Sequence, residues 1–150
     1  MGGISLDQAQ MMAIMTNDII LKQLMLVPTN VFTNFAELRI NYFVEGYIAE
    51  SIVIPNVCRL LIKSAHMSPT NNEFVKENNV IIEVFVPSSQ DRMTGFERRT
   101  NIIIGRLIKL FHNQMIHNRK FKLETSNELF SSEVGFKRAF VMFSFKRAFS

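Results

Sequence analysis

Apolar positions follow a helical period near the N-terminus and other periods further along the chain. Residues 5–27 carry a broad apolar face at helical spacing, and the polar stretch 16–18 interrupts it, which predicts a second, shorter helix. Pro28 ends this segment, because proline disfavours helical structure in the residue before it. Residues 31–56 are rich in apolar side chains without a clear period, so we expect helical or irregular structure there.

Two apolar stretches in the middle of the chain predict strands. Residues 57–63 and 80–86 are both rich in β-branched and aliphatic side chains. The second stretch is almost continuously apolar, which is typical of a central strand covered on both faces, and only Glu83 departs from it. The polar residues 64–79 between the two strands are expected to form a loop.

A basic amphipathic segment follows, from Asp91 or Thr94 to His112. Its apolar side chains recur at spacings of three, four and seven, which predicts a helix that packs this stripe on the sheet. Basic side chains occupy much of the remaining helical surface: Arg98, Arg99, Arg106 and Lys109.

Two further strands are predicted near the C-terminus. Residues 120–123 alternate between polar and apolar side chains, and we expect the polar residues 125–127 and 131–132 to form a connection after them. Residues 136–149 predict a longer strand with two different faces. One face carries Ala139, Val141, Phe143 and Phe145, and the other carries Arg138, Phe140, Met142, Ser144 and Lys146.

Together these elements predict an α+β fold: a small, mostly antiparallel sheet with one main amphipathic helix packed on it and an N-terminal helix. A length of 150 residues fits one domain better than two. We therefore expect residues 1–150 to form a single α+β domain. Within it, an N-terminal helical or irregular segment spans 1–56, and the sheet-plus-helix core spans 57–150.

Charge and cysteine content narrow the classes of protein. Residues 1–50 carry 2 basic and 5 acidic side chains, whereas residues 51–150 carry 15 and 8, so the second part is basic. A basic region can attract nucleic acid or an acidic protein, although a solvated surface is the simpler interpretation. Cys58 is the only cysteine, which excludes an intramolecular disulfide and a thiolate metal cluster. It lies in an apolar run and is expected to be a small buried hydrophobe.

The sequence contains few residues in patterns that are typical of catalysis or metal binding. The three histidines do not form a His-Glu-x-x-His pair, and the sequence contains no Gly-x-Ser-x-Gly elbow, Walker loop or Gly-x-Gly-x-x-Gly turn. Glu83 is the one carboxylate inside a strong strand, and such a glutamate is usually paired or on the less buried face. Because acid–base catalysis needs at least two convergent groups, we predict no catalytic, cofactor-binding or metal-binding residue and no enzyme.

Nucleic-acid binding is the main alternative to a protein–protein role. The C-terminal strand joins basic and aromatic side chains, which together can hold a single strand by charge and stacking. Phenylalanines in a two-faced strand are more often part of a core, so a solvated edge beside a core is the competing interpretation. The residues concerned are Lys137, Arg138, Lys146 and Arg147, with Phe136, Phe140, Phe145 and Phe149.

Several segments between residues 57 and 147 follow one another in a recognisable order. They are the strand 59–64, the loop with Asn71-Asn72, the strand 81–87, the start of the helical segment at Asp91-Arg92, the end of that helix at 106–110 and the closing strand 135–146. This order is similar to that of the small neck proteins (tail terminators and head–tail connectors) of tailed bacteriophages that infect Gram-positive bacteria. The resemblance is a pattern of elements rather than a catalytic signature, and residues 1–50 add little to it.

The resemblance implies a structural virion protein, assembled in the host cytoplasm, that forms a homo-oligomeric ring. A tail terminator is typically a hexamer that caps the tail tube and joins it to head-completion proteins, while genomic DNA passes through the lumen without sequence-specific binding. A connector or stopper ring remains an alternative, and no membrane is implied. Because such lumens are often acidic, the basic surface is expected to face a partner ring. The interface candidates are Phe96, Arg98, Arg106, Lys109, Lys137, Arg138, Lys146 and Arg147.

Overall fold

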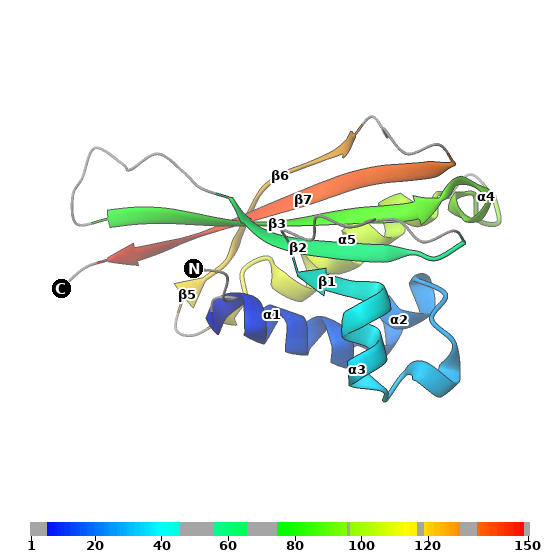
Figure 1. Cartoon of the computed structure of the whole chain (residues 1–150). Coiled ribbons are helices and arrows are strands. Elements are labelled where there is room, and N and C mark those ends of the chain that lie inside the picture. The colour runs from blue at the N-terminus through cyan, green and yellow to red at the C-terminus, as the bar shows by residue number, and fades with distance from the viewer. Residues whose placement is uncertain are drawn as a thin grey trace.

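A five-stranded sheet with helices packed against one of its faces forms the molecule (Figure 1). The computed structural model describes residues 6–45, 56–65, 75–95, 97–116, 119–129 and 135–148. The strand order is β1-β2-β3-β7-β6, and a small separate sheet pairs β4 with β5. The strands are β1 (Phe43–Glu45), β2 (Arg59–Ala65), β3 (Val75–Pro87), β4 (Met115–Ile116), β5 (Arg119–Lys120), β6 (Lys122–Leu129) and β7 (Phe136–Ala148).

The sheet is mostly antiparallel, as the sequence predicted. Only β1 and β2 run parallel, whereas β2–β3, β3–β7 and β7–β6 are antiparallel pairs. The strand predicted at 80–86 is confirmed as part of β3, which lies at the centre of the sheet. Val80, Ile82 and Val84 of this strand enter the main core, while Phe85 enters a smaller cluster with Val44 and Leu61.

The helical elements lie mainly in the N-terminal part and between β3 and β4. They are α1 (Leu6–Asn17), α2 (Ile19–Leu24), the 3-10 turn η1 (Thr29–Val31), α3 (Phe35–Glu37), the π-helical turn η2 (Leu38–Tyr42), α4 (Ser88–Asp91) and α5 (Arg99–Phe111). The predicted interruption is confirmed, because the Asp18 carboxylate accepts a hydrogen bond from the backbone N–H of Leu21 and caps α2. The sequence predicted helical or irregular structure in the segment 31–56 and did not predict the strand β1 there.

The amphipathic helix α5 packs its apolar stripe on β3 and β7, as expected. Ile103, Leu107 and Phe111 are fully buried. The ring of Phe111 meets that of Phe143 edge-on, with 5.7 Å between centroids. The predicted start of this helix at 91–94 is wrong. Gly95 has a φ of +81°, which a right-handed helix cannot contain, so α5 begins only at Arg99.

Two other boundaries differ from the prediction because polar residues that were expected in loops lie in strands. Residues 125–127 are polar yet belong to β6, whose outer side has no neighbouring strand among the described residues. Likewise β3 begins at Val75, inside the segment 64–79 that was expected to be a loop. No described helix is both long and apolar enough to span a membrane.

Candidate assembly surface

The three described basic candidates on or beside α5 have different surroundings. Lys109 is exposed, and Arg98 is half-exposed at the N-cap with Nη1 3.8 Å from the Asp91 carboxylate. Arg106 is instead mostly buried against α2, where its guanidinium donates two hydrogen bonds to Asp18, at 2.9 and 2.7 Å. Arg106 therefore joins two helices of its own chain, and of the three only Lys109 and Arg98 present a charge to solvent.

The Asp18–Arg106 pair also fixes the ionisation of both groups. Burial of Asp18 opposes its negative charge, but hydrogen bonds from Arg106 and Leu21 and the positive charges of Arg106 and Lys22 outweigh that effect. The pKa of Asp18 consequently lies below its ordinary value. The hydrogen bond to Asp18 likewise raises the pKa of Arg106. One carboxylate thus caps α2 and holds α5 beside it.

A second ion-pair cluster lies on the face of the sheet opposite α5. The buried Glu83 carboxylate accepts hydrogen bonds from Lys63 at 3.0 Å and from Arg138 at 3.3 Å. The Arg138 guanidinium also lies 5.0 Å from the centroid of the Phe85 ring. The sequence left two settings open for Glu83, an ion pair or the less buried face of the sheet. In the structure Glu83 is paired and buried.

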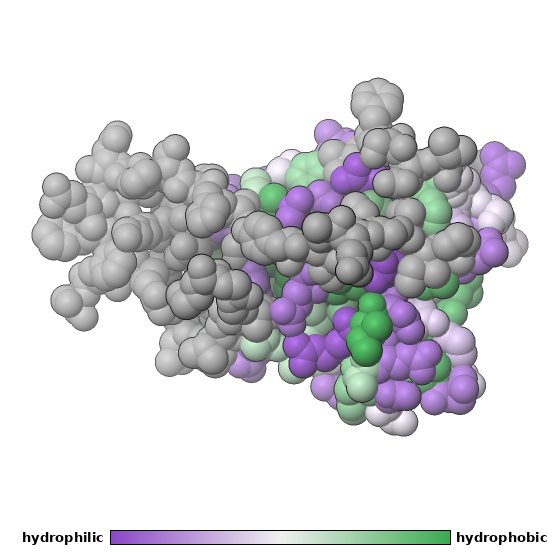
Figure 2. Space-filling model, in the orientation of Figure 1, coloured by the Kyte–Doolittle hydropathy of each residue, from purple (hydrophilic) through white to green (hydrophobic). Residues whose placement is uncertain are grey.

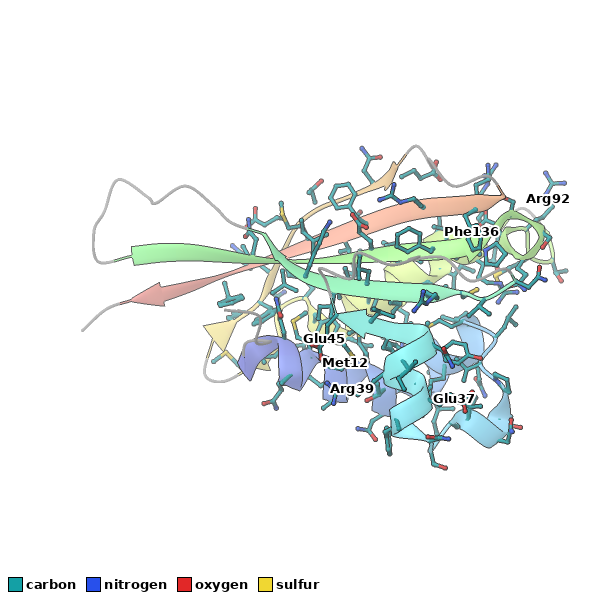
Figure 3. All side chains as sticks on the ribbon, in the orientation of Figure 1. Met12, Glu37, Arg39, Glu45, Arg92 and Phe136 are labelled. Carbon is teal, nitrogen blue, oxygen red and sulfur yellow. The ribbon has the colours of Figure 1, made fainter. Side chains whose placement is uncertain are left out.

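The basic and aromatic candidates of β7 are not gathered on one described surface. Lys137 is exposed, but Arg138 is occupied by Glu83 and Phe85. Phe145 is buried and its ring stacks on Phe121 at 4.7 Å, and Phe136 packs against the smaller apolar cluster near α4 (Figure 3). The side chains of Lys146 and Arg147, and Phe96 and Phe149 as whole residues, lie outside the described part of the structure.

The far ends of β3 and β7 extend past the described parts of both neighbouring strands. In those parts, β2 pairs with β3 as far as Asn79, and β6 pairs with β7 as far as Ser144. Beyond these residues the pairing of β3 with β7 continues between Val75–Asn78 and Phe145–Ala148. We call these eight residues the β-ribbon. It projects from the sheet at the end opposite α4 (Figure 1).

The base of the β-ribbon contains an unpaired polar group. Asn79 is only 3% exposed, and neither its side-chain nitrogen nor its side-chain oxygen has a hydrogen-bond partner. A buried amide in this state destabilises a fold, typically by about 1–3 kcal/mol. The sheet thus carries a local destabilising group where the described pairing of β2 with β3 ends.

Several large hydrophobic side chains are exposed. Five of them lie in the N-terminal helical segment and one lies on β4: Ile19, Ile20, Leu26, Phe35 and Ile40, and Met115. On the face drawn in Figure 2, green hydrophobic residues lie among purple hydrophilic ones in the region of α3. One polar contact there is the ion pair of Arg39 with Glu45, 2.7 Å apart, which connects η2 with β1 (Figure 3).

The groups that could carry chemistry have structural roles. Burial raises the pKa of the Cys58 thiol to about 12, and its sulfur lies 3.4 Å from Oε1 of Gln90. Nδ1 of His112 accepts a hydrogen bond from the backbone N–H of Leu123 at 3.0 Å. Within the described ranges, no three His, Cys, Asp or Glu side chains are grouped to hold a metal ion. Cys58 is confirmed as a buried hydrophobe.

Comparison with known protein families decides the classification. The family model named YomW matches residues 11–145, which is most of the chain. The chain belongs to the YomW family. This family is phage-derived, which is consistent with a phage protein. The match includes every strand of the sheet except the last three residues of β7.

The other comparisons carry no argument about function. No curated protein matches it significantly. One solved structure is similar over 89% of this chain and 97% of its own, with 8% identical residues and a TM-score of 0.44. A likeness at this level carries no argument about this YomW protein.

Sequence reasoning missed the residues that define the β-ribbon. The polar stretch Lys76-Glu77-Asn78-Asn79 was taken as part of a loop, because it lacks the apolar side chains of a covered strand. A signal was nevertheless present in the predicted strand 136–149, which is about twice as long as the strand 80–86. The backbone N–H and C=O groups of a long strand need partners along its length, and in the structure β3 and β7 each have 13 residues.

Proposed function

We propose that this YomW protein is a structural subunit at the head–tail junction of a tailed phage, where copies of it form a ring. The observation that carries the proposal is a sheet with two unlike outer strands, β1 and β6, in a protein of a phage-derived family. When the two outer strands of a sheet differ, one edge of a subunit can contact the other edge of an identical subunit. Such heterologous contacts generate a ring when the rotation from each subunit to the next closes on itself.

Within that class, a tail terminator is the role we propose, with a connector or stopper ring as the alternative. A terminator ring caps the tail tube and contacts the head-completion proteins, so it needs surfaces on both ends as well as contacts between subunits. The exposed apolar side chains near α2 and α3 are suited to a protein contact, because large apolar groups on a surface often mark one. Genomic DNA would pass through the lumen without base-specific contacts.

The proposal is tested by removing the protein from the phage that encodes it. A stop codon early in its gene, with a plasmid copy as the complementing control, should yield filled heads and unattached tails in lysates examined by electron microscopy. Tails of abnormal length would indicate a terminator, whereas heads that lose their DNA would indicate a connector or stopper. Normal infectious particles in the absence of the protein would contradict the proposal.

A nucleic-acid-binding module is the second candidate predicted from the sequence, and two contacts weigh against it. Phe145 is buried against Phe121, so its ring offers no free face to a base, and Arg138 is held by Glu83. A salt titration of DNA binding separates the candidates. Micromolar or tighter affinity at physiological salt with a steep salt slope would favour the nucleic-acid-binding module over the neck protein.

A further inference from the structure

Gly105 lies in the middle of α5 and is exposed, and nothing in the described part of its own chain requires a glycine there. Its backbone is helical, without the positive φ of Gly95, so no turn requires it. A Cβ added at Gly105 would meet no described atom within 4 Å, so no close neighbour requires it. Because glycine destabilises a helix interior relative to alanine, the physical reason that remains is a close approach by another molecule.

The side chains beside Gly105 form a basic surface. Asn101 and Lys109 lie about one helical turn to either side of it on the same face, and both are exposed. The exposed Arg98 is the N-cap of the helix. We call Arg98, Asn101, Gly105 and Lys109 the α5 outer face. The Lys109 ammonium has no partner among the described residues, so it is free to pair with a carboxylate from outside.

Arg98 also belongs to a like-charge pair at the N-terminal end of this face. It forms an isolated antiparallel bridge with Arg92, and both side chains are exposed. The buried Asp91 carboxylate lies 3.8 Å from Nη1 of Arg98, whereas Arg92 has no partner in the described ranges. Like charges directly opposite each other destabilise an antiparallel pair, so a carboxylate from outside would stabilise this end.

A complementary surface lies on β6, where α5 of the same chain leaves it uncovered. Ser126 and Glu128 are exposed, although they pair with two β7 residues that are buried in the main core, Val141 and Ala139. Directly paired residues point to the same face of a sheet, so Ser126 and Glu128 point to the side on which α5 packs. This face of β6 is therefore open to a helix from another molecule.

We propose that the α5 outer face of one copy of this chain packs on this face of β6 in the next copy. Gly105 then lies over Ser126, and these two small residues let the helix and the strand approach closely. The Lys109 ammonium pairs with the Glu128 carboxylate. Each copy offers one surface of each kind, so the interface is heterologous and repeats around a ring. The inference rests on the proposed ring, for which it names the contact between subunits.

Spacing and charge support this register. Gly105 and Lys109 are about 6 Å apart along a helix, and Ser126 and Glu128 are about 7 Å apart along a strand. The like-charge arginine pair then lies toward the exposed Glu124, at the other end of the exposed part of β6. Basic groups thus meet acidic groups at both ends of the contact, which sets the orientation of the two subunits.

The test is a charge exchange in the full chain, measured by native mass spectrometry and negative-stain electron microscopy. Lys109→Glu and Glu128→Lys should each weaken ring formation by about tenfold or more, because like charges then face each other, and the two together should restore rings. Lys120→Glu makes the same charge change at an exposed residue of β5 and should leave ring formation unchanged. Thermal melting checks that all variants are folded.

Gly105→Ala adds a readout that a purely structural role would not give. This variant should melt at a higher temperature than the wild type, because alanine favours a helix and the new Cβ has no described atom within 4 Å. Ring formation should nevertheless weaken, since the added methyl group fills the space at the crossing. Rings that form as well as those of the wild type would overturn the inference.

Three further outcomes separate the inference from the proposed function. Rings that persist in both single charge variants, or losses that the combined variant does not restore, would overturn the inference and leave the proposed function standing. Rings that persist while Lys109→Glu lowers the affinity for a short DNA duplex would mean that the α5 outer face binds nucleic acid, which also overturns the inference. A wild-type chain that forms no ring, alone or on purified tails, would overturn both.

Discussion

The two ends of the β3–β7 strand pair differ in what surrounds them. Around Val80 and Phe143 the pair lies between β2 and β6 and is covered by α5, and both side chains are buried in the main core. Beyond Asn79 and Ser144 the two strands continue to pair with each other as the β-ribbon, where Phe145 still packs on Phe121. The first end therefore carries most of the described core contacts of this strand pair, and the second reaches the core through Phe145.

This difference indicates how one strand pair combines a packed part with a part that projects from the sheet. Main-chain pairing makes the ribbon an extension of the central strands, so its direction is set by the packed part of the sheet. A two-stranded ribbon is only marginally stable on its own in water, so its stability depends on Phe145, which enters the main core, and on the strands that it continues. Mutations in the two regions should consequently change stability by different amounts.

The largest expected effect on stability is in the packed region. Phe143→Ala removes a fully buried ring that contacts Phe111 edge-on, and should lower the free energy of unfolding by about 3–5 kcal/mol. Urea denaturation followed by circular dichroism measures the change. A loss below about 1 kcal/mol would mean that this part of the sheet is not the stabilising core.

The contact between α2 and α5 should give the next largest effect. Asp18→Asn keeps a residue that can cap α2 but removes the negative charge that faces Arg106. Together with Arg106→Gln it forms a double-mutant cycle, which measures the coupling energy of the pair. We expect a coupling energy of about 2 kcal/mol at neutral pH, since the hydrogen bonds are charge-assisted.

The same pair predicts a pH dependence. The pKa of folded Asp18 lies below its ordinary value of 3.8, so the folded state binds fewer protons than the unfolded state as the pH falls. The stabilisation that the Asp18 carboxylate contributes is therefore complete above pH 3.8, and it is lost as the pH falls through the pKa of folded Asp18. Wild-type stability should decrease more steeply than that of Asp18→Asn across this range. Parallel curves would contradict the ion pair.

A smaller effect, of opposite sign, is expected at the junction of the two regions. Asn79→Val replaces a buried amide without hydrogen-bond partners by an apolar, strand-forming side chain, and should raise the free energy of unfolding by about 1 kcal/mol. The midpoint of urea denaturation measures it, with Asn127→Val on the exposed edge strand β6 as the control. Destabilisation would show that the Asn79 amide has a partner in solution.

The smallest expected effect on stability is in the ribbon itself. Lys76→Glu with Arg147→Glu should change the free energy of unfolding of the monomer by less than about 0.5 kcal/mol, because a cross-strand pair of like charges is replaced by another pair of like charges. Denaturation at a concentration too low for assembly measures this. A large loss would mean that the ribbon stabilises the monomer, which would remove the contrast between the two regions.

The core elements could be predicted from the sequence because their patterns arise from burial. The stripe of α5, the alternation in β7 and the continuous apolar run of β3 each reflect a face that packs on another element. The break before α2 was also predictable, since Asp18 is a typical capping residue. The α+β class followed from these elements.

The exposed edges were not predictable by the same means. In β6, Glu124 to Glu128 are exposed, which accounts for their polar side chains. A polar strand resembles a loop in sequence, and the polar start of β3 was taken for a loop for the same reason. The candidate surface was likewise only partly predictable. Helical spacing places Arg106 on the basic face of α5, but it cannot show that Asp18, 88 residues away, neutralises it. Pairing over such distances depends on the tertiary fold.

Cryo-electron microscopy of the head–tail junction in purified virions is the most direct measurement of the proposed role. We predict a ring of this chain between the tail tube and the head-completion proteins. A junction that contains no copy of this chain would contradict the account.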